Sequence, residues 1–164
     1  MAGLGVDDRR DDGAGLEAAR YLARLSPAGA DVLVLSGRTA DLLDAWAGAP
    51  LAVVLDAVRS GAAPGTLHRL DGLSLPLPDL PRRGSTHDLG LAATVELGRA
   101  LGLLPERLVI LGIEAEDVSP GRGLSPAVHR GVRRAVHEAL AELGAARHRP
   151  VRDRRHPTGE PGRA

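Results

Sequence analysis

Three ionisable residues stand where the sequence pattern predicts that a strand ends or a helix begins. Asp12 closes an acidic segment flanked by glycines, Asp56 follows the apolar run Leu51–Leu55, and His87 lies in the polar sequence Ser-Thr-His-Asp. Ligands of open α/β sheets bind outside the carboxyl ends of the strands, where such junctions gather. Two carboxylates and an imidazole at one edge of a sheet would form a site for a divalent cation or for acid–base catalysis.

Each of the three residues also has an ordinary structural explanation. Asp12 and its neighbour Asp11 fall at the N-terminus of a predicted helix, where free N–H groups and the helix dipole favour a carboxylate. Asp56 can cap a turn, although a carboxylate that ends a buried strand is costly unless it is paired or binds a cation. A lone histidine such as His87, in the first turn of a predicted helix, is usually a surface residue. The positive end of the helix dipole nevertheless keeps its ring neutral, which is the form that binds a metal.

The chemical types of these three residues limit which ligands they could bind. An Asp/Asp/His set suits Zn²⁺, Ni²⁺ or Mn²⁺ better than a soft metal. Gly3 and Gly5 have the first spacing of a dinucleotide-binding loop, but Asp8 occupies the third glycine position and the acidic residues would repel a pyrophosphate. The residue types therefore predict a metal or acid–base site, and they leave open whether the three residues meet.

Short apolar runs and amphipathic stretches alternate along the chain. The apolar runs predict strands over residues 31–36, 51–58 and 107–114, and the more alternating residues 66–70 predict an edge strand. The helical periodicity predicts helices over residues 12–25, 39–48, 86–103 and 126–144, with Thr39 and Ser125 as caps. This alternation indicates an α/β fold, a three-layer sandwich with helices on both faces of a mostly parallel, twisted sheet of about five strands.

The amino-acid composition limits the size of the domain, the kinds of site and the kinds of partner that this chain can have. The chain has 164 residues, enough for one domain with a sizeable core, and its 21 basic residues balance its 21 acidic ones. It has no cysteine, which excludes disulfides and thiolate metal sites, and the scarcity of aromatic residues and of long apolar runs argues against nucleic-acid and membrane partners. Residues 147–164 hold six arginines, three prolines and two acidic residues, so we expect a folded domain over residues 1–146 and a disordered basic tail over residues 147–164.

Five short motifs follow one another along residues 3–143. They are Gly3-x-Gly5 with Asp11-Asp12-Gly13-x-Gly15, Asp56-Ala57 with Pro64-Gly65-Thr66, Ser85-x-His87-x-Leu89-Gly90, Gly112-Ile113-Glu114, and Gly123-Leu124-Ser125-Pro126. Each motif is weak alone, but in this order they resemble the pattern of the [NiFe]-hydrogenase maturation proteases. These are endopeptidases that trim the C-terminal tail of the hydrogenase large subunit.

The resemblance implies a function and a site. It implies an endopeptidase that removes the C-terminal extension of a nickel-loaded large-subunit precursor, with the nickel supplied by that precursor and with Zn²⁺ or Cd²⁺ able to occupy the same site. Asp12, Asp56 and His87 would bind the metal, and Asp12 or Asp56 would activate water as general base. The family carries both aspartic-type and metallo-type labels, so the mechanism stays open between them. We further expect a cytoplasmic monomer whose partner is the precursor.

The sequence departs from the family pattern in three places. Val6 replaces the asparagine of the first motif, and Arg38 stands where the family has a second glycine. Arg38 and Thr39 would meet the substrate at the mouth of the cleft, or the bulky Arg38 would partly block entry to it. Only two residues precede Gly3, so the interior first strand is predicted to be truncated or missing. A start further upstream, a stub strand and a degenerate protein would each explain this, and the first is favoured. The alternatives to a maturation protease are a non-catalytic relative that holds the precursor and a protease of the same fold with another protein substrate.

Other polar and aromatic residues receive structural interpretations. Glu114 ends a predicted buried strand near the expected cleft, and a role in support of the site is the less favoured interpretation of it. His129 and His137 are eight residues apart, not four as in a zinc-binding helix, and are assigned to a solvated basic face. Trp46 and Tyr21 are predicted at the edge of the core.

Overall fold

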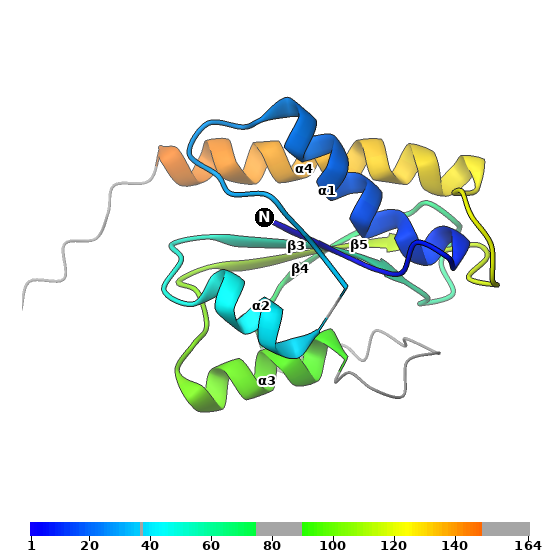
Figure 1. Ribbon diagram of the computed structural model, residues 1–164. Coiled ribbons are helices and arrows are strands. Elements are labelled where there is room, and N and C mark those ends of the chain that lie inside the picture. Colours follow the sequence, from blue (N-terminus) through cyan, green and yellow to red (C-terminus); the bar gives the residue numbers. More distant parts are fainter. Residues whose placement is uncertain (37, 75–89, 149–164) are drawn as a thin grey trace, which may run out of the picture.

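The computed structural model describes residues 1–36, 38–74 and 90–148, which form a three-layer α/β sandwich (Figure 1). The strands are β1 (Ala2–Leu4), β2 (Leu33–Leu35), β3 (Ala52–Val58), β4 (Leu67–Asp71) and β5 (Leu108–Glu114). The helices are the short 3-10 helix η1 (Arg10–Gly13), α1 (Ala14–Leu25), α2 (Thr39–Trp46), α3 (Leu91–Leu101) and α4 (Pro126–Arg147). The fold class predicted from the sequence is confirmed.

The five strands form one sheet in the order β2-β1-β3-β5-β4. β1 pairs in parallel with β2 and with β3, and β3 pairs in parallel with β5. β4 runs antiparallel to β5 and lies at the edge of the sheet, which confirms the edge strand predicted over residues 66–70. The chain passes from β1 to β2 on one side and then crosses to β3 on the other side of β1. The strand order therefore reverses between β1 and β3, and α/β sheets form their ligand crevices at such a reversal.

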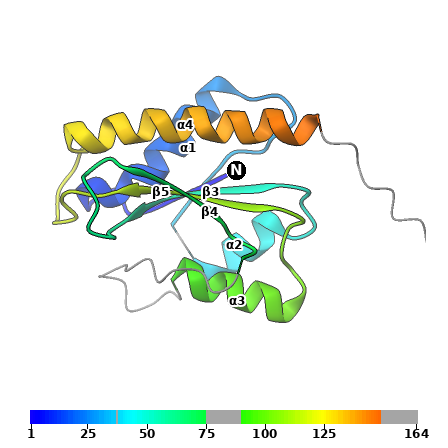
Figure 2. The ribbon, with the colours of Figure 1, turned by 180° about the vertical axis from the view of Figure 1, so that it is seen from behind.

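Helices cover both faces of the sheet (Figures 1 and 2). On one face α1 and α4 pack against side chains of β3 and β5 that include Leu55 and Leu111. On the other face α2 and α3 pack against Val54 and Ile110, and Trp46, which is 1% exposed, lies inside this core and not at its edge as predicted. β3 and β5 are buried along their whole length because strand side chains alternate between the two covered faces.

The two strands β1 and β2 are short. β1 takes an interior position in the sheet although it has only three residues, so the first strand is present as a stub. The strand predicted over residues 31–36 is present as β2, but it lies at the edge of the sheet, with Leu33 37% and Val34 44% exposed, and it is not buried as its apolar run would indicate. An apolar run indicates a strand, but the number of its neighbours depends on the topology of the sheet.

The start of α2 also differs from the prediction. Thr39 does not cap this helix, because Arg38 occupies the N-cap position and no side chain bonds the free N–H groups there. The hydroxyl of Thr39 lies instead 3.1 Å from the hydroxyl of Thr94 in α3, so the two hydroxyls form a hydrogen bond that joins the helices of this face. The exposed Arg38 forms a loose ion pair, 4.0 Å from its Nε to the carboxylate of Asp41.

The ends of α3 and α4 agree only in part with the prediction from the sequence. Ser125 caps α4 as predicted, since its hydroxyl accepts a hydrogen bond from the N–H of Val128 at 3.4 Å. α4 continues past the predicted end at Gly144 to Arg147, and α3 begins at Leu91, later than the predicted start at residue 86. The tail predicted for residues 147–164 lies outside the described residues from residue 149 onward.

A close contact at Gly15 fixes α1 against the carboxyl ends of β1 and β3. A Cβ atom added to Gly15 would lie 2.4 Å from the carbonyl oxygen of Leu4 and 2.3 Å from that of Leu55. Only glycine fits there, so the first turn of α1 touches the last residues of one strand and the residue before Asp56 in the other. This contact keeps η1, which directly precedes α1, beside β3.

Replacing Gly15 with alanine tests this contact. The new methyl group would overlap two backbone oxygens, so we expect Gly15→Ala to lower the free energy of unfolding by about 1–3 kcal/mol, as overpacking does. Urea denaturation measures the change. Gly144→Ala in α4 is the matched control, because nothing lies within 4 Å of its added Cβ and alanine stabilises a helix interior by up to about 1 kcal/mol. A Gly15→Ala variant as stable as the wild type would contradict the close approach of α1.

Candidate active site

Asp12 and Asp56 lie at the same edge of the sheet, beside the two strands between which the strand order reverses. Asp56 belongs to β3, near its carboxyl end, and Asp12 belongs to η1, which packs against β3. Gly5, directly after β1, lets the backbone of η1 approach closely. It has a φ of 146°, which residues other than glycine rarely adopt, and a Cβ atom added to it would lie 2.1 Å from the carbonyl oxygen of Asp12. The structure therefore brings the two predicted acidic residues to neighbouring segments of one edge.

The two carboxylates have different surroundings. Asp56 is only 2% exposed and lies on the same face of β3 as Val54, the face that α2 and α3 cover. Its Oδ1 accepts a hydrogen bond from the N–H of Ala57 at 2.9 Å, which offsets part of the cost of burying the charge. Asp12 is partly exposed. The pair thus combines one carboxylate fixed within the sheet with one that solvent reaches.

Asp11 has a structural role that its position in the sequence does not reveal. Its side chain is fully buried, and it accepts three hydrogen bonds from backbone N–H groups: from Glu116 (3.0 Å) and Asp117 (2.9 Å) at Oδ2, and from Ser125 (2.7 Å) at Oδ1. The expected interaction with the start of the following helix is not made, since α1 has no side-chain cap. Asp11 instead binds the segment between β5 and α4.

Backbone hydrogen bonds add to this attachment of the segment before α1. The N–H of Arg10 donates to the carbonyl of Gly121 at 3.0 Å, and the N–H of Gly121 donates to the carbonyl of Asp8 at 2.9 Å. The N–H of Asp11 donates to the carbonyl of Asp117 at 3.0 Å. The ion pair between Arg10 and Asp117 (3.3 Å) is largely exposed and contributes little, so the buried carboxylate and the backbone bonds hold the two segments together.

Glu114 is a further buried carboxylate near this edge. It ends β5, is 2% exposed, and accepts hydrogen bonds from Ser60 Oγ (2.8 Å) and from the N–H of Gly61 (2.9 Å). The Nε2 atom of His68 lies 3.0 Å from its Oε2. Burial by itself raises the pKa of Glu114, but the hydrogen bonds from Ser60, Gly61 and His68 together outweigh burial and leave the pKa below its ordinary value. Glu114 thereby holds the loop that follows β3.

The group of Ser60, His68 and Glu114 is not a nucleophilic triad. In a triad the imidazole binds the acid with one ring nitrogen and the nucleophile with the other. Here the Nε2 atom of His68 meets both partners, 3.0 Å from Glu114 and 3.4 Å from Ser60, and Ser60 donates directly to Glu114. The arrangement supports the structural role that is the favoured interpretation of Glu114 from the sequence.

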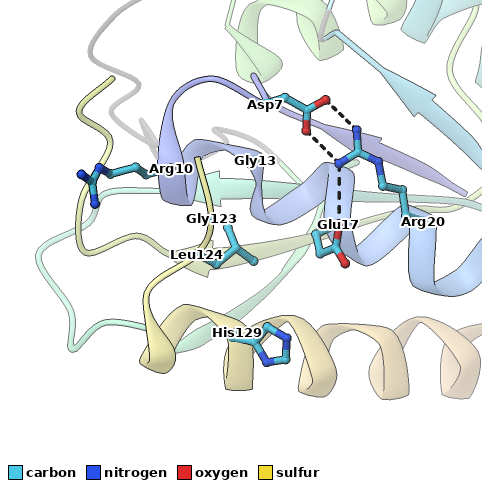
Figure 3. Close-up of a pocket in the computed structure, with 8 residues that line it drawn as sticks. All are labelled: Asp7, Arg10, Gly13, Glu17, Arg20, Gly123, Leu124 and His129. Atoms are coloured by element: carbon cyan, nitrogen blue, oxygen red, sulfur yellow. Dashed lines mark hydrogen bonds and ion pairs between the residues drawn. The ribbon is translucent and has the colours of Figure 1, made fainter. Parts of the chain in front are cut away.

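A pocket of about 270 Å³ lies between the N-terminal loop, α1 and the start of α4 (Figure 3). Arg20 donates two hydrogen bonds to the carboxylate of Asp7, at 2.7 and 2.6 Å, and lies 3.7 Å from Glu17, so the acidic charges of the pocket are compensated (Figure 3). His129 lines it from α4, and the guanidinium of Arg10 points outward. Of the residues predicted for the site, the four that the structure describes, Asp12, Arg38, Thr39 and Asp56, are not among those that line it.

The third predicted metal ligand, His87, lies outside the described residues. Within residues 1–36, 38–74 and 90–148, no group of three or more His, Asp or Glu side chains could hold a metal ion. Two carboxylates fit a divalent cation as hard oxygen donors, and an imidazole from residues 75–89 would complete the predicted set. Arg38, proposed to meet the substrate, follows β2 at the same edge of the sheet and is exposed, whereas the hydroxyl of Thr39 is engaged by Thr94.

Glu114→Gln tests the role of the buried carboxylate. Because the pKa of Glu114 in the folded protein is below its ordinary value of 4.5, the charge stabilises the fold above that value and this contribution is lost as the pH falls through the folded-state pKa. We expect the variant to be about 1–3 kcal/mol less stable at neutral pH, because the NH₂ group of its glutamine would face the donors Ser60 and Gly61. The difference in stability should shrink as the pH falls below 4.5 and through the folded-state pKa of Glu114.

Urea denaturation at several pH values measures this difference, and Asp44→Asn, at an exposed position of α2, is the control that should show little change. A Glu114→Gln variant whose loss of stability is the same at all pH values would contradict the role of the ionised carboxylate.

Comparison with known proteins identifies the family of this chain. A family model described as hydrogenase maturation protease matches residues 19–142, a segment that includes Asp56 and His87 and begins after Asp12. The chain is 33% identical over 115 residues to the hydrogenase 2 maturation protease of Escherichia coli. This alignment covers 68% of this chain and 70% of that protein. It is 29% identical over 136 residues, 81% of this chain, to the hydrogenase expression/formation protein HupD of Thiocapsa roseopersicina, and it spans 62% of the length of HupD.

The structural comparison agrees with the sequence comparison. The solved structure of the hydrogenase maturating endopeptidase HybD from Escherichia coli matches with a TM-score of 0.72 at 28% identity, over 88% of this chain and 91% of that chain. Among the described residues, no helix has the length and apolar character needed to span a lipid bilayer. From the family match, the related sequences and the shared fold, the chain belongs to the hydrogenase maturation protease family, a family of peptidases.

Proposed function

We propose that this protein is an endopeptidase that removes the C-terminal extension of a nickel-loaded [NiFe]-hydrogenase large-subunit precursor. The observation that carries the proposal is the position of Asp12 and Asp56, which come from distant parts of the sequence to one edge of the sheet where its strand order reverses. Family membership supports the class of substrate, because the relatives are named for hydrogenase maturation.

Asp12, Asp56 and His87 are proposed to bind the nickel of the precursor, with Zn²⁺ or Cd²⁺ able to take its place. Asp12 is partly exposed, so a metal that arrives with a protein substrate has access to it, whereas the buried Asp56 offers a fixed second carboxylate. A bound metal would polarise the scissile carbonyl or position the precursor. Asp12 or Asp56 would take a proton from the attacking water as general base.

Arg38 is proposed to contact the precursor beside this site. Its guanidinium is exposed at the end of β2, and its only ion pair within the described part of the chain is the 4.0 Å contact with Asp41. Thr39 would act mainly by holding the start of α2 through Thr94. A cytoplasmic monomer remains the expectation for the state of the protein.

The proposed reaction is tested by incubating the protein with a large-subunit precursor and following the mass of the precursor by mass spectrometry. We expect loss of the C-terminal extension from the nickel-loaded precursor and no cleavage of the nickel-free precursor. Binding without cleavage would favour a non-catalytic relative that holds the precursor. Neither binding nor cleavage would favour another protein substrate and contradict the proposal.

His87→Ala tests the proposed metal ligand. We expect the rate of processing to fall at least about 100-fold, in the range of losses seen when a catalytic side chain is removed, while the circular dichroism spectrum and melting temperature are unchanged. His137→Ala, at an exposed histidine of α4, is the matched control and should keep the wild-type rate. Full activity of the His87→Ala variant would remove His87 from the site.

A further inference from the structure

We infer that Asp11 is a positioning residue for Asp12, because its buried carboxylate fixes η1 to the segment between β5 and α4. The inference rests on the proposed function, in which Asp12 binds a metal ion and is a candidate general base. It assigns the two adjacent acidic residues to different tasks. Asp11 determines where the backbone of η1 lies, and Asp12 presents its carboxylate from that backbone.

The geometry at Asp11 requires a side chain with two oxygen acceptors. Both of its oxygens are used, one by the N–H groups of Glu116 and Asp117 and the other by the N–H group of Ser125. An asparagine at this position would have one oxygen acceptor, and its NH₂ group would face a backbone donor. Hydrogen bonds to a charged acceptor are stronger than those between neutral groups, and the Asp11 side chain that accepts them is fully buried.

The three donors lie directly beside regular elements of the fold. Glu116 and Asp117 come shortly after β5, which is buried along its whole length, and Ser125 is the N-cap residue of α4. Asp11 therefore connects the segment after β1 with a central strand and with the longest helix. A side chain attached in this way takes its position from the scaffold and not from its own loop.

Asp12 depends on its backbone for its position. Its N–H donates to the carbonyl of Arg9 at 3.0 Å, and its carbonyl packs against Gly5. Among the described residues, the Asp12 side chain itself takes part in no hydrogen bond or ion pair. Because the side chain has no such anchor of its own there, a shift of η1 would move the carboxylate directly.

The test is calorimetric titration of the full chain with Cd²⁺, well below the melting temperature of each variant. We expect the Kd for Cd²⁺ of the Asp11→Asn variant to rise about 10–100-fold, as when groups that orient metal ligands are replaced, and the binding of the Asp12→Ala variant to be lost. Asp11→Ser is the second variant if Asp11→Asn does not fold, since the smaller side chain leaves room for water to accept from the three N–H groups.

Ser125→Ala separates positioning from general loss of stability. It removes the hydroxyl that caps α4 and lowers stability, but it keeps the N–H group that donates to Asp11. We expect its Kd for Cd²⁺ to equal that of the wild type. A Kd unchanged in both Asp11 variants, or raised equally in the Ser125→Ala variant, would overturn the inference while leaving the metal site intact. A wild-type protein that does not bind Cd²⁺ would overturn the proposed site, and the inference with it.

Discussion

The buried carboxylate of Asp11 accepts hydrogen bonds from three backbone N–H groups and holds η1, which carries Asp12, in place. The cost of removing the Asp11 carboxylate from water is offset by donors from the segment after β5 and from the start of α4. These donors lie more than 100 residues away in the sequence, so the interaction exists only when both ends of the domain have folded. The loop after β1 consequently behaves as part of the scaffold, although it contains little regular structure.

Topology and close packing then bring the candidate residues together. The reversal of strand order between β1 and β3 opens the edge of the sheet, and Gly15 lets α1 approach the carbonyl groups of both strands. The short strand β1 takes part in this arrangement because it pairs on both sides, over three residues with β2 and over two residues with β3. The relation to the hydrogenase maturation proteases is visible in the shared fold as well as in sequence identity.

Two buried acidic residues near this edge, Asp11 and Glu114, accept hydrogen bonds and are not paired with arginine side chains among the described residues. Asp11 is bound by backbone N–H groups, and Glu114 by a hydroxyl, a backbone N–H group and an imidazole, whereas Glu142 on α4 is paired with Arg69 and Arg107. Neutral donors offset the cost of burial without cancelling the charge. An edge built in this way favours the approach of a cation, in agreement with the metal site proposed at Asp12 and Asp56.

By itself the sequence determined the fold class, the approximate positions of the strands and most helices, and the candidate acidic residues, because alternation of apolar runs and short polar motifs are local properties. Only the tertiary structure decided that β2 is an exposed edge, that Thr39 joins two helices instead of capping one, and that Asp11 and Asp12 have different surroundings. The same holds for Glu114, whose partners come from the loop after β3 and from β4. Burial and hydrogen-bond partners depend on segments far away in the chain, so no local pattern specifies them.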